Sequence, residues 1–260
     1  MHTDAAMFLR ANLARGEDGF WVRETKGQVD AVVQLGPSGN MLVHGSGLNR
    51  GDWADLRRGF IGKVCRGANG LPDAVAAALD GLGLHAAPRA LDRVEPRCGL
   101  MLDKMVLPDG PGVLRTWNAD DLAWLSVWRA DYLTEAMGAA QGAATQALAR
   151  VEAGRLIARG TGRLLQRDGI PLAITAFNAV LPDQVQIGGV YTPASLRGRG
   201  HARRAVALHL MEARKTGIRR AVLFSASVAA TRAYTALGFE QLGNYRLVRF
   251  DAPVQIGGAT

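Results

Sequence analysis

The segment between Pro193 and Arg204 contains residue types that can hold a phosphate group. Glycine lets the backbone approach an anion and adopt positive φ, and the segment contains Gly198 and Gly200. A helix is predicted to start after Gly200, and the first amides of a helix lack internal partners and carry partial positive charge. Full positive charge comes from Arg197, Arg199, Arg203 and Arg204. The pattern indicates a diphosphate site, and the alternative is a plain loop before a surface helix.

A strand and a helix must hold this loop in position. The apolar run 185–192 is rich in β-branched residues, which is typical of a buried strand. Gly188 and Gly189 inside the run indicate a bulge or a close backbone approach. Pro193 ends the strand because it cannot donate to the ladder. The helix after the loop has one apolar face, formed by Ala202, Val206, Leu210 and Ala213.

A second segment, 227–239, follows another predicted strand at 221–225, whose continuous apolar run is typical of a buried parallel strand. The order Arg197-x-x-Gly200-x-Ala202 resembles the acetyl-CoA signature of the GNAT superfamily of N-acetyltransferases. The second segment resembles that superfamily's N-x-x-A-x-x-x-Y-x-x-x-G-F motif through Ala230, Tyr234, Gly238 and Phe239, with Ser227 in place of Asn. Two motifs in this order, each after a predicted strand, are more specific than either alone.

The resemblance covers about 150 residues from Val113 onward. It implies an α+β fold in which helices flank a mixed central sheet, and it implies that acetyl-CoA lies between the strands 185–192 and 221–225, which part near Gly189. Backbone groups of two of these residues, Val190 and Thr192, would pair with the pantetheine arm like an added strand. The residues expected to contact the cofactor are Val190, Tyr191, Thr192, Arg197, Gly198, Arg199, Gly200, His201, Ala202, Arg203, Ser227 and Tyr234. We interpret His201 as a spacer rather than a base.

Transfer of an acyl group from a thioester to an amine needs a neutral amine, a polarised carbonyl and a proton for the departing thiolate. The resemblance implies that the amide of Val190 or Tyr191 polarises the carbonyl and that Tyr234 is the general acid. Packing in the core is the alternative role of Tyr234. Glu135 is a candidate to hold or deprotonate the amine, because it lies on a predicted aromatic helix that borders the acceptor site in the family. The alternative for Glu135 is a solvated carboxylate, and we interpret the tryptophans of this helix as core residues.

The first 108 residues predict a helix, a hairpin, a strand, a helix and a strand, which repeats the order of the second half in shortened form. We therefore interpret residues 1–108 as a degenerate GNAT-like domain and residues 112–260 as a complete one, in tandem. The boundary is the turn-rich segment PDGPG at 108–112. The glycine segment at 60–70 lacks the R-x-x-G-x-A spacing, so no cofactor is expected in the first half.

Composition limits the classes of protein that the chain can be. Nearly half of its 260 residues are hydrophobic, which indicates a globular fold. No apolar run reaches the length of a membrane helix, the N-terminal residues do not resemble a secretory signal, and Cys65 and Cys98 form neither a disulfide framework nor a metal motif. A cytoplasmic protein without a metal is expected. The net charge of +8 allows nucleic acid binding, but the arginines are scattered and no basic-aromatic motif appears.

These features together predict an N-acetyltransferase that acts on a primary amine of a small molecule or amino acid. A CoA-binding sensor or scaffold without catalysis is the alternative from another class. A transferase for a protein or tRNA-linked amine is the third hypothesis. No motif identifies the acceptor or the general base, and the oligomeric state stays open, with a homodimer compatible with the sequence.

Overall fold

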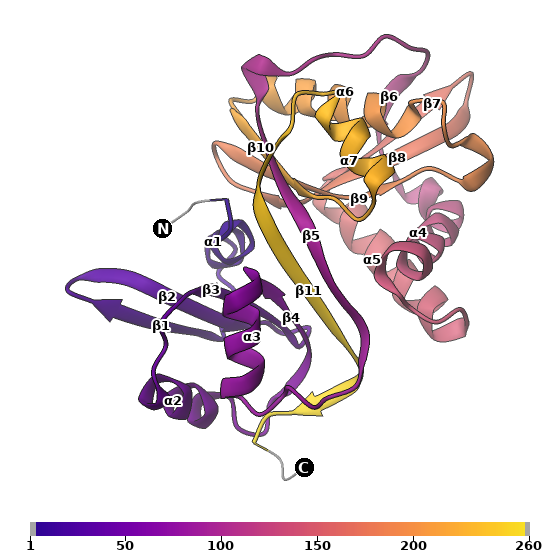
Figure 1. Cartoon of the computed structure of the whole chain (residues 1–260). Coiled ribbons are helices and arrows are strands. Elements are labelled where there is room, and N and C mark those ends of the chain that lie inside the picture. Colours follow the sequence, from indigo (N-terminus) through magenta and orange to yellow (C-terminus); the bar gives the residue numbers. More distant parts are fainter. Residues whose placement is uncertain (1–3, 258–260) are drawn as a thin grey trace. The chain divides into compact units, whose positions relative to one another are not determined.

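The computed structural model describes residues 4–257, which divide into two compact units. The first unit comprises the described residues up to Glu95 together with those from Gly243 onward, and the second is Pro96–Leu242. The chain passes between the units twice, inside the strands β5 (Arg89–Met101) and β11 (Glu240–Gln255). Each unit is described by itself below (Figure 1).

The sheet of the first unit has the strand order β1-β2-β3-β4-β11. The pairs β1–β2, β2–β3 and β4–β11 are antiparallel, whereas β3–β4 is parallel. The helix α2 connects the two parallel strands, as a crossover must. The bounds are α1 Met7–Ala14, β1 Phe20–Thr25, β2 Gln28–Leu35, β3 Asn40–Gly45, α2 Arg50–Phe60, β4 Val64–Gly70 and α3 Pro72–Gly81.

Both faces of this sheet are covered by helices. Successive strand residues point to opposite faces, and on β2 the two neighbours Val32 and Val33 belong to different cores. Val33 packs with side chains of α2 and α3, including Leu56 and Leu79. Val32 packs with Leu9 of α1 on the other face. The first unit is therefore a helix–sheet–helix sandwich.

The second unit contains a mixed sheet in the order β5-β10-β9-β8-β7-β6. Only the pair β9–β10 is parallel among the ladders given for this sheet. The helix α6 makes the crossover between these two strands. The bounds are β6 Val113–Thr116, α4 Leu122–Met137, α5 Ala143–Arg159, β7 Gly162–Arg167, β8 Ile170–Val180, β9 Gln184–Tyr191, α6 His201–Lys215, β10 Arg220–Phe224 and α7 Val228–Thr235.

Two helices cover each face of the second sheet (Figure 1). On one face α4 and α5 pack against strand residues such as Leu164 and Ile174. On the other face α6 and α7 pack around Ile187 and Leu223. Leu165, the neighbour of Leu164 on β7, lies in a separate cluster with Ala205 of α6, so the two faces alternate along the strand. The sequence expectation of a mixed sheet flanked by helices is confirmed.

The 3-10 turn Ala119–Asp121 leads directly into α4 and is capped by Asn118 and Asp121. The Asn118 side chain accepts from the Asp121 amide, and the Asp121 carboxylate accepts from the Asn118 amide at 2.9 Å. The Arg115 guanidinium donates twice to the same carboxylate, at 2.6 and 2.7 Å. These bonds lower the pKa of Asp121, with Arg115 as the main cause. The cap orients the helix that carries Glu135.

Most of the predicted elements are present. Asp168-Gly169 is a strong hairpin signal in the sequence, and it forms the turn between β7 and β8 with both residues at positive φ. Three strands differ from the expectation. The strand β1 was not predicted, because it is an edge strand whose side chains alternate poorly between buried and exposed. The sequence predicts strands at 96–107 and 244–250. The strand β5 begins and ends earlier than its prediction, at Arg89 and Met101, and β11 extends beyond its predicted segment in both directions.

The compact units do not coincide with the sequence segments 1–108 and 112–260. The last strand of the chain belongs largely to the first unit, and residues 96–108 belong to the second. Residues 1–3 and 258–260 of the predicted domains lie outside the described residues. The proposal that the two segments are copies of one fold rests on the shared order of a meander, a helix crossover and a parallel pair.

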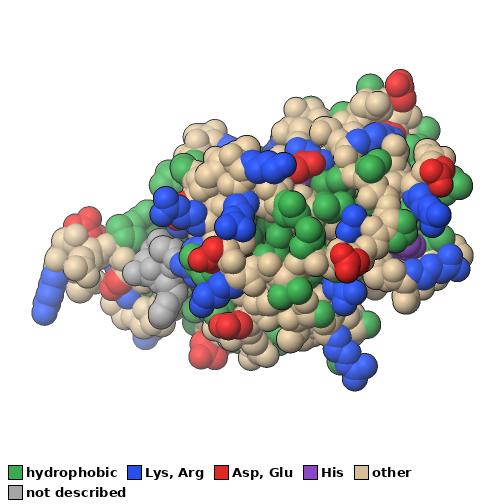
Figure 2. Space-filling view, turned by 90° about the horizontal axis from the view of Figure 1, so that it is seen from above, with side chains coloured by type: hydrophobic (Ala, Val, Ile, Leu, Met, Phe, Trp, Pro, Cys, Tyr) green, Lys and Arg blue, Asp and Glu red, His purple; other side chains and the backbone are tan. Residues whose placement is uncertain are grey.

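The charged side chains are mixed on the surface. Figure 2 shows Lys and Arg side chains spread over the visible face, with Asp and Glu side chains between them. A concentrated basic stripe, which would favour nucleic acid binding, is not seen on that face. Among residues 4–257, no helix is both long and apolar enough to cross a membrane.

A buried histidine makes the second unit sensitive to acid. His209 of α6 is 2% exposed and stacks on Phe177, with 3.6 Å between the ring centroids. Burial lowers the pKa of His209 to about 3, and the charge of Arg163 adds to this effect. An unfolded chain binds a proton at this position below a pH of about 6.5. The folded protein does not do so until about pH 3.

We therefore expect the free energy of unfolding to fall as the pH drops from about 6.5 towards 3, by up to about 1.4 kcal/mol per pH unit. Replacement His209→Leu should remove this component, which is about 2 kcal/mol at pH 5. Urea unfolding at pH 7.5 and 5.0 measures it, with the exposed His85→Leu as the control. Equal acid losses in the wild type and in His209→Leu would contradict this explanation.

Candidate active site

The strand β9 separates from its parallel neighbour β10 within the sheet. In the part of the chain that the structure describes, their ladder ends at the pair Ile187–Leu223. The strand β9 continues to Tyr191, so the segment after Ile187 has lost its pairing with β10. The strands part close to Gly189, where the sequence predicts it. Backbone groups on this edge of β9 are available to an added strand-like ligand.

A bulge in β9 marks the same place. On its other side β9 pairs with β8, where Ala176 is opposite Gly188 and Ile174 is opposite Tyr191. Between these two pairs β9 has one residue more than β8, which defines a bulge. Gly189 lies in the bulge with φ of 60°, a conformation that side-chain-bearing residues rarely adopt. The bulge and the end of the β10 ladder together open the sheet at this point.

A buried guanidinium lies directly beside the bulge. A Cβ atom on Gly189 would be 3.1 Å from Nη1 of Arg129. The Arg129 side chain comes from α4, is 15% exposed, and donates from Nε to Glu152 of α5 at 2.9 Å. It also lies over the Tyr132 ring at 4.7 Å from the centroid. Sequence reasoning missed Arg129 and Glu152, because no motif connects a helix residue with a glycine 60 positions further along the chain.

The loop after β9 presents its backbone to solvent. Gly198 and Gly200 are exposed, with φ of 76° and 77°. A Cβ atom on Gly198 would meet no atom within 4 Å. Gly200 caps α6 without a side-chain hydrogen bond, and no backbone bond is given for the amides from Gly198 to Arg203 within the described residues. The corner is therefore open and rich in unpaired donors, which suits an anion.

The cations of the loop differ in their surroundings. Arg199 is exposed, whereas Arg203 is partly buried. Arg204 is turned away from the loop and donates to the carbonyl of Pro108 at 2.7 Å. Partial burial and then the charge of Arg199 lower the pKa of His201, so this imidazole favours its neutral form. Positive charge near the corner comes chiefly from the arginines.

A polar cluster connects β9 with α4 on one face of the sheet. The Tyr191 hydroxyl lies 3.3 Å from a carboxylate oxygen of Glu135 and 3.4 Å from one of Asp131. Trp128 packs edge-on against the Tyr191 ring. Burial, followed by the charges of Asp131 and Glu135, raises the pKa of Tyr191 to about 12, although Arg197 opposes the shift. The phenol therefore stays protonated and acts as a donor.

Arg197 joins this cluster to the loop. Its guanidinium forms an ion pair with Glu135, donates to the Thr192 carbonyl at 2.9 Å and lies over the Tyr191 ring. Glu135 is exposed, with 45% of its side chain accessible, and it is also paired with Arg197, so its candidate role and the alternative of a solvated carboxylate both stay predictions. Sequence reasoning identified Glu135 but missed Asp131, which lies one helical turn earlier on α4.

The other face of the sheet holds Tyr234. This side chain of α7 is 8% exposed and packs edge-on against Phe239 in the core cluster that Val190 also borders. Ser227 caps α7, and its hydroxyl accepts from the Ala230 amide at 3.1 Å. The serine in place of the motif's Asn thus has a structural role at the start of the helix. Tyr191 and Tyr234 lie on opposite faces, on either side of the opening in the sheet.

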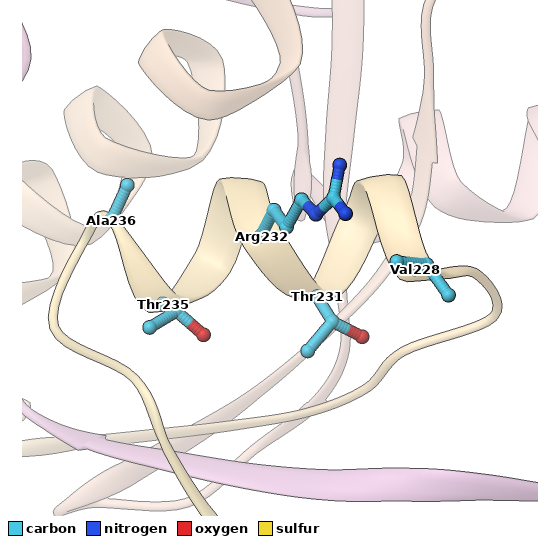
Figure 3. A pocket seen from close by; sticks show the side chains of 5 residues that line it. All are labelled: Val228, Thr231, Arg232, Thr235 and Ala236. Atoms are coloured by element: carbon cyan, nitrogen blue, oxygen red, sulfur yellow. The ribbon is translucent and has the colours of Figure 1, made fainter.

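An open hollow of about 450 Å³ runs along the outer face of α7 and is lined by Val228, Thr231, Arg232, Thr235 and Ala236. Figure 3 shows that four of these side chains come from α7 and that Ala236 follows directly at its C-terminal end, with Thr231 and Thr235 on the same side. None of the predicted site residues lines it.

Among the described residues, no three His, Cys, Asp or Glu side chains are grouped so as to hold a metal ion. Burial raises the pKa of the Cys65 thiol to about 11.

Two parallel strands that part at a bulge, followed by an open glycine corner at a helix N-terminus, define a class of domain. It is an α+β domain whose unpaired strand edge and open helix N-terminus can bind an extended ligand that carries a diphosphate. Residues 116–239 match the model of the acetyltransferase (GNAT) family. This segment is a GNAT acetyltransferase domain, and its enzymatic class is that of the acyltransferases.

Solved structures agree on the fold. The chain is similar to a GCN5-related N-acetyltransferase from Kribbella flavida, with 18% identity, a TM-score of 0.62 and coverage of 95% of this chain and 94% of that one. It is similar to a tandem GNAT protein from the clavulanic acid biosynthesis pathway, with 16% identity, a TM-score of 0.54 and coverage of 93% and 83%. A GNAT acetyltransferase from Colwellia psychrerythraea has 14% identity, a TM-score of 0.53 and coverage of 96% and 98%. No curated protein sequence matches the chain.

The bulge glycine can be tested by its effect on stability. Replacement Gly189→Ala should lower the free energy of unfolding by about 1–2 kcal/mol, because alanine is strained at positive φ and its Cβ would press on Arg129. Gly154 in the middle of α5 is the control, since a Cβ there meets nothing within 4 Å. Gly154→Ala should instead stabilise by about 0.5–1 kcal/mol. Urea unfolding of both variants measures the difference, and a stabilising Gly189→Ala would contradict the bulge geometry.

Proposed function

We propose that this protein transfers an acetyl group from acetyl-CoA to a primary amine of a small molecule or amino acid. The GNAT family normally binds acetyl-CoA. The observation that carries the proposal is the open corner from Gly198 to Arg203 beside the point where β9 leaves β10. An unpaired strand edge inside a sheet costs free energy, so a ligand that pairs with β9 would compensate for the early end of the ladder.

The residues fit the cofactor in two places. The free edge of β9 supports pairing of Val190 and Thr192 backbone groups with the amides of the pantetheine arm. The amides from Gly198 to Arg203 would bind the diphosphate, with charge from Arg199 and Arg203. Gly198 matters because a side chain there would occupy the open space beside the loop amides, where the diphosphate would bind. Ala202 follows at the first turn of α6, where a small residue keeps the amides accessible.

The chemical step follows from the two faces of the opening. The thioester supplies the acetyl group, and an amide of the bulge, from Val190 or Tyr191, would donate to its carbonyl oxygen as negative charge develops there. A neutral amine attacks from the side of α4, where the polar cluster of Tyr191 and Glu135 lies. The thiolate departs on the side of α7. A phenol has a pKa of about 10 and a thiol one of about 8.5, so proton transfer from a phenol to a thiolate is slightly unfavourable and needs direct contact. Tyr234 is the phenol on that side.

Glu135 contributes to the acceptor side in this proposal. Its ion pair with Arg197 and its contact with Tyr191 give it a fixed position. The Glu135 carboxylate is already engaged by Arg197 and Tyr191, so Glu135 is better placed to orient the acceptor through Tyr191 than to remove a proton. Water at the exposed rim can accept the proton of the amine.

Release of the CoA thiol tests the function. Purified protein is incubated with acetyl-CoA and a panel of amines that includes alkyl amines, amino alcohols and amino acids, and free thiol is measured. Amine-dependent release supports the transferase. Tight CoA binding without release in any reaction would instead support the alternative of a CoA-binding sensor.

The glycine corner makes a specific prediction for cofactor affinity. Replacement Gly198→Ala should raise the Kd for CoA about tenfold, which corresponds to about 1.4 kcal/mol, because it strains the loop and fills the cradle. Gly217→Ala is the matched control, since Gly217 follows the other end of α6 with φ of 97° and equally open space. Both variants should lose similar stability, and only Gly198→Ala should lose affinity in isothermal titration calorimetry. Equal CoA affinities would argue against the corner as the diphosphate site.

The general acid makes a second prediction. Replacement Tyr234→Phe keeps the ring packed against Phe239 and removes the hydroxyl, so kcat should fall about 100-fold while the Kd for CoA stays unchanged. Tyr245→Phe is the control, because Tyr245 is also buried but lies on β11 in the first unit. Turnover measured from pH 6 to pH 10 decides the question. Unchanged turnover of Tyr234→Phe over this range would reject the acid role.

A further inference from the structure

Two of the three carboxylates on α4 and α5 are paired with arginines. Glu152 is paired with Arg129, and Glu135 is paired with Arg197. Asp131 is exposed, and the contact given for its carboxylate is the Tyr191 hydroxyl at 3.4 Å. No Lys or Arg of residues 4–257 forms an ion pair with it. Asp131 is therefore the one carboxylate of α4 and α5 that no described Lys or Arg pairs with.

Asp131 also lines a small cavity. The cavity has a volume of about 150 Å³ and lies between α4, the connection after α4 and the start of α5. Its polar lining comes from Asp131, Thr134, Gln141, Thr145 and Gln146. Pockets for drug-sized ligands span about 300–1,000 Å³, so this cavity suits a small head group rather than a whole large molecule.

The lining is suited to a group that donates several hydrogen bonds. The Thr145 hydroxyl donates to the Ala140 carbonyl at 2.6 Å, which leaves its oxygen as an acceptor. Amide oxygens of Gln141 and Gln146 and the carboxylate of Asp131 are further acceptors. An alkylammonium group carries three donors and one positive charge. Such a group would form an ion pair with the Asp131 carboxylate and would donate hydrogen bonds to the acceptors of Thr145, Gln141 and Gln146.

The cavity is not where the acetyl group is transferred. Tyr191 follows the bulge directly, and its whole side chain plus one hydrogen bond separates the β9 backbone from Asp131. An ammonium bound to Asp131 is therefore too far from the bulge to be the attacking nitrogen. It must be a second, unreactive basic group of the same acceptor.

We propose that the acceptor is a diamine or polyamine. One nitrogen, held as an ammonium by Asp131 at the cavity, orients the molecule, and the other nitrogen, in its neutral form, attacks the thioester at the bulge. The new N–C bond forms as the C–S bond breaks, the nitrogen loses its proton to water, and the thiolate takes a proton. This inference rests on the proposed function and names its substrate class.

Three substrates of one length test the proposal. Pentane-1,5-diamine has two amines, 5-aminopentan-1-ol replaces one by a hydroxyl, and pentylamine lacks the second polar group. The wild type should use the diamine with a kcat/KM at least tenfold above that of either monoamine. Asp131→Asn should remove most of this preference, because it should raise KM for the diamine at least fivefold more than KM for either monoamine.

Two further variants serve as controls. Asp120→Asn removes an exposed carboxylate from the turn before α4 and should leave all three values unchanged. Asp131→Glu keeps the charge and should retain part of the preference. Calorimetric titration of the CoA-bound protein with pentane-1,5-diamine should give a Kd about tenfold weaker in Asp131→Asn.

The outcomes separate the two proposals. Thiol release with monoamines or amino acids but no preference for the diamine would overturn the inference and leave the transferase intact. A diamine preference that persists in Asp131→Asn, or an equal loss for all three substrates, would also overturn it. No release with any amine would remove the proposed function and the inference together.

Discussion

The early end of the β9–β10 ladder is the constraint on which the site depends. Parallel strands normally continue to pair, because an unpaired buried amide costs free energy. Here pairing stops at Ile187–Leu223, and the bulge at Gly189 turns the following backbone out of register with both neighbours. The glycine has a second effect, since the absence of a Cβ lets Arg129 lie against the strand. One backbone irregularity thus creates an unpaired edge and brings a guanidinium to it.

The first unit has the same connection but a different corner. Its parallel pair β3–β4 is joined through α2, just as β9–β10 is joined through α6. At the start of α2, however, the Asn49 side chain accepts from the amides of Gly51 and Asp52, at 2.7 and 3.1 Å, and the Asp52 carboxylate accepts from the Asn49 amide. Arg23 also binds Asp52 at 3.0 Å. The amides that an anion would need are already bonded, and a carboxylate stands among them, so the two corners differ in chemistry although their topology is shared.

The sequence predicts the corner well and the acceptor side poorly, for physical reasons. A glycine at positive φ before a helix is a local requirement, so Gly198 and Gly200 leave a readable pattern, as does the Asp168-Gly169 turn. Ser227 replaces the Asn of the motif, and its hydroxyl serves as the N-cap of α7, so the replacement keeps a structural role at this position. Arg129, Asp131 and Glu152 gain their meaning only from packing between α4, α5 and β9, and such long-range proximity leaves no spacing in the sequence. The edge strand β1 was missed because its partial exposure blurs the alternation that predicts strands.

Arg197 shows why these two sides of the site are not independent. It is the first residue of the glycine loop signature, and its guanidinium binds Glu135 of α4 while its Nε donates to the carbonyl of Thr192 at the end of β9. An anion at the loop would compete with Glu135 for the same guanidinium, because a diphosphate carries more charge than a carboxylate. If the ion pair loosened, Arg197 would neutralise less of the negative charge of Glu135 beside Tyr191. The acceptor side would then become more negative. In the proposed reaction, binding of acetyl-CoA would thereby increase the attraction for the proposed diamine through one shared arginine, by direct contact rather than by a change of fold.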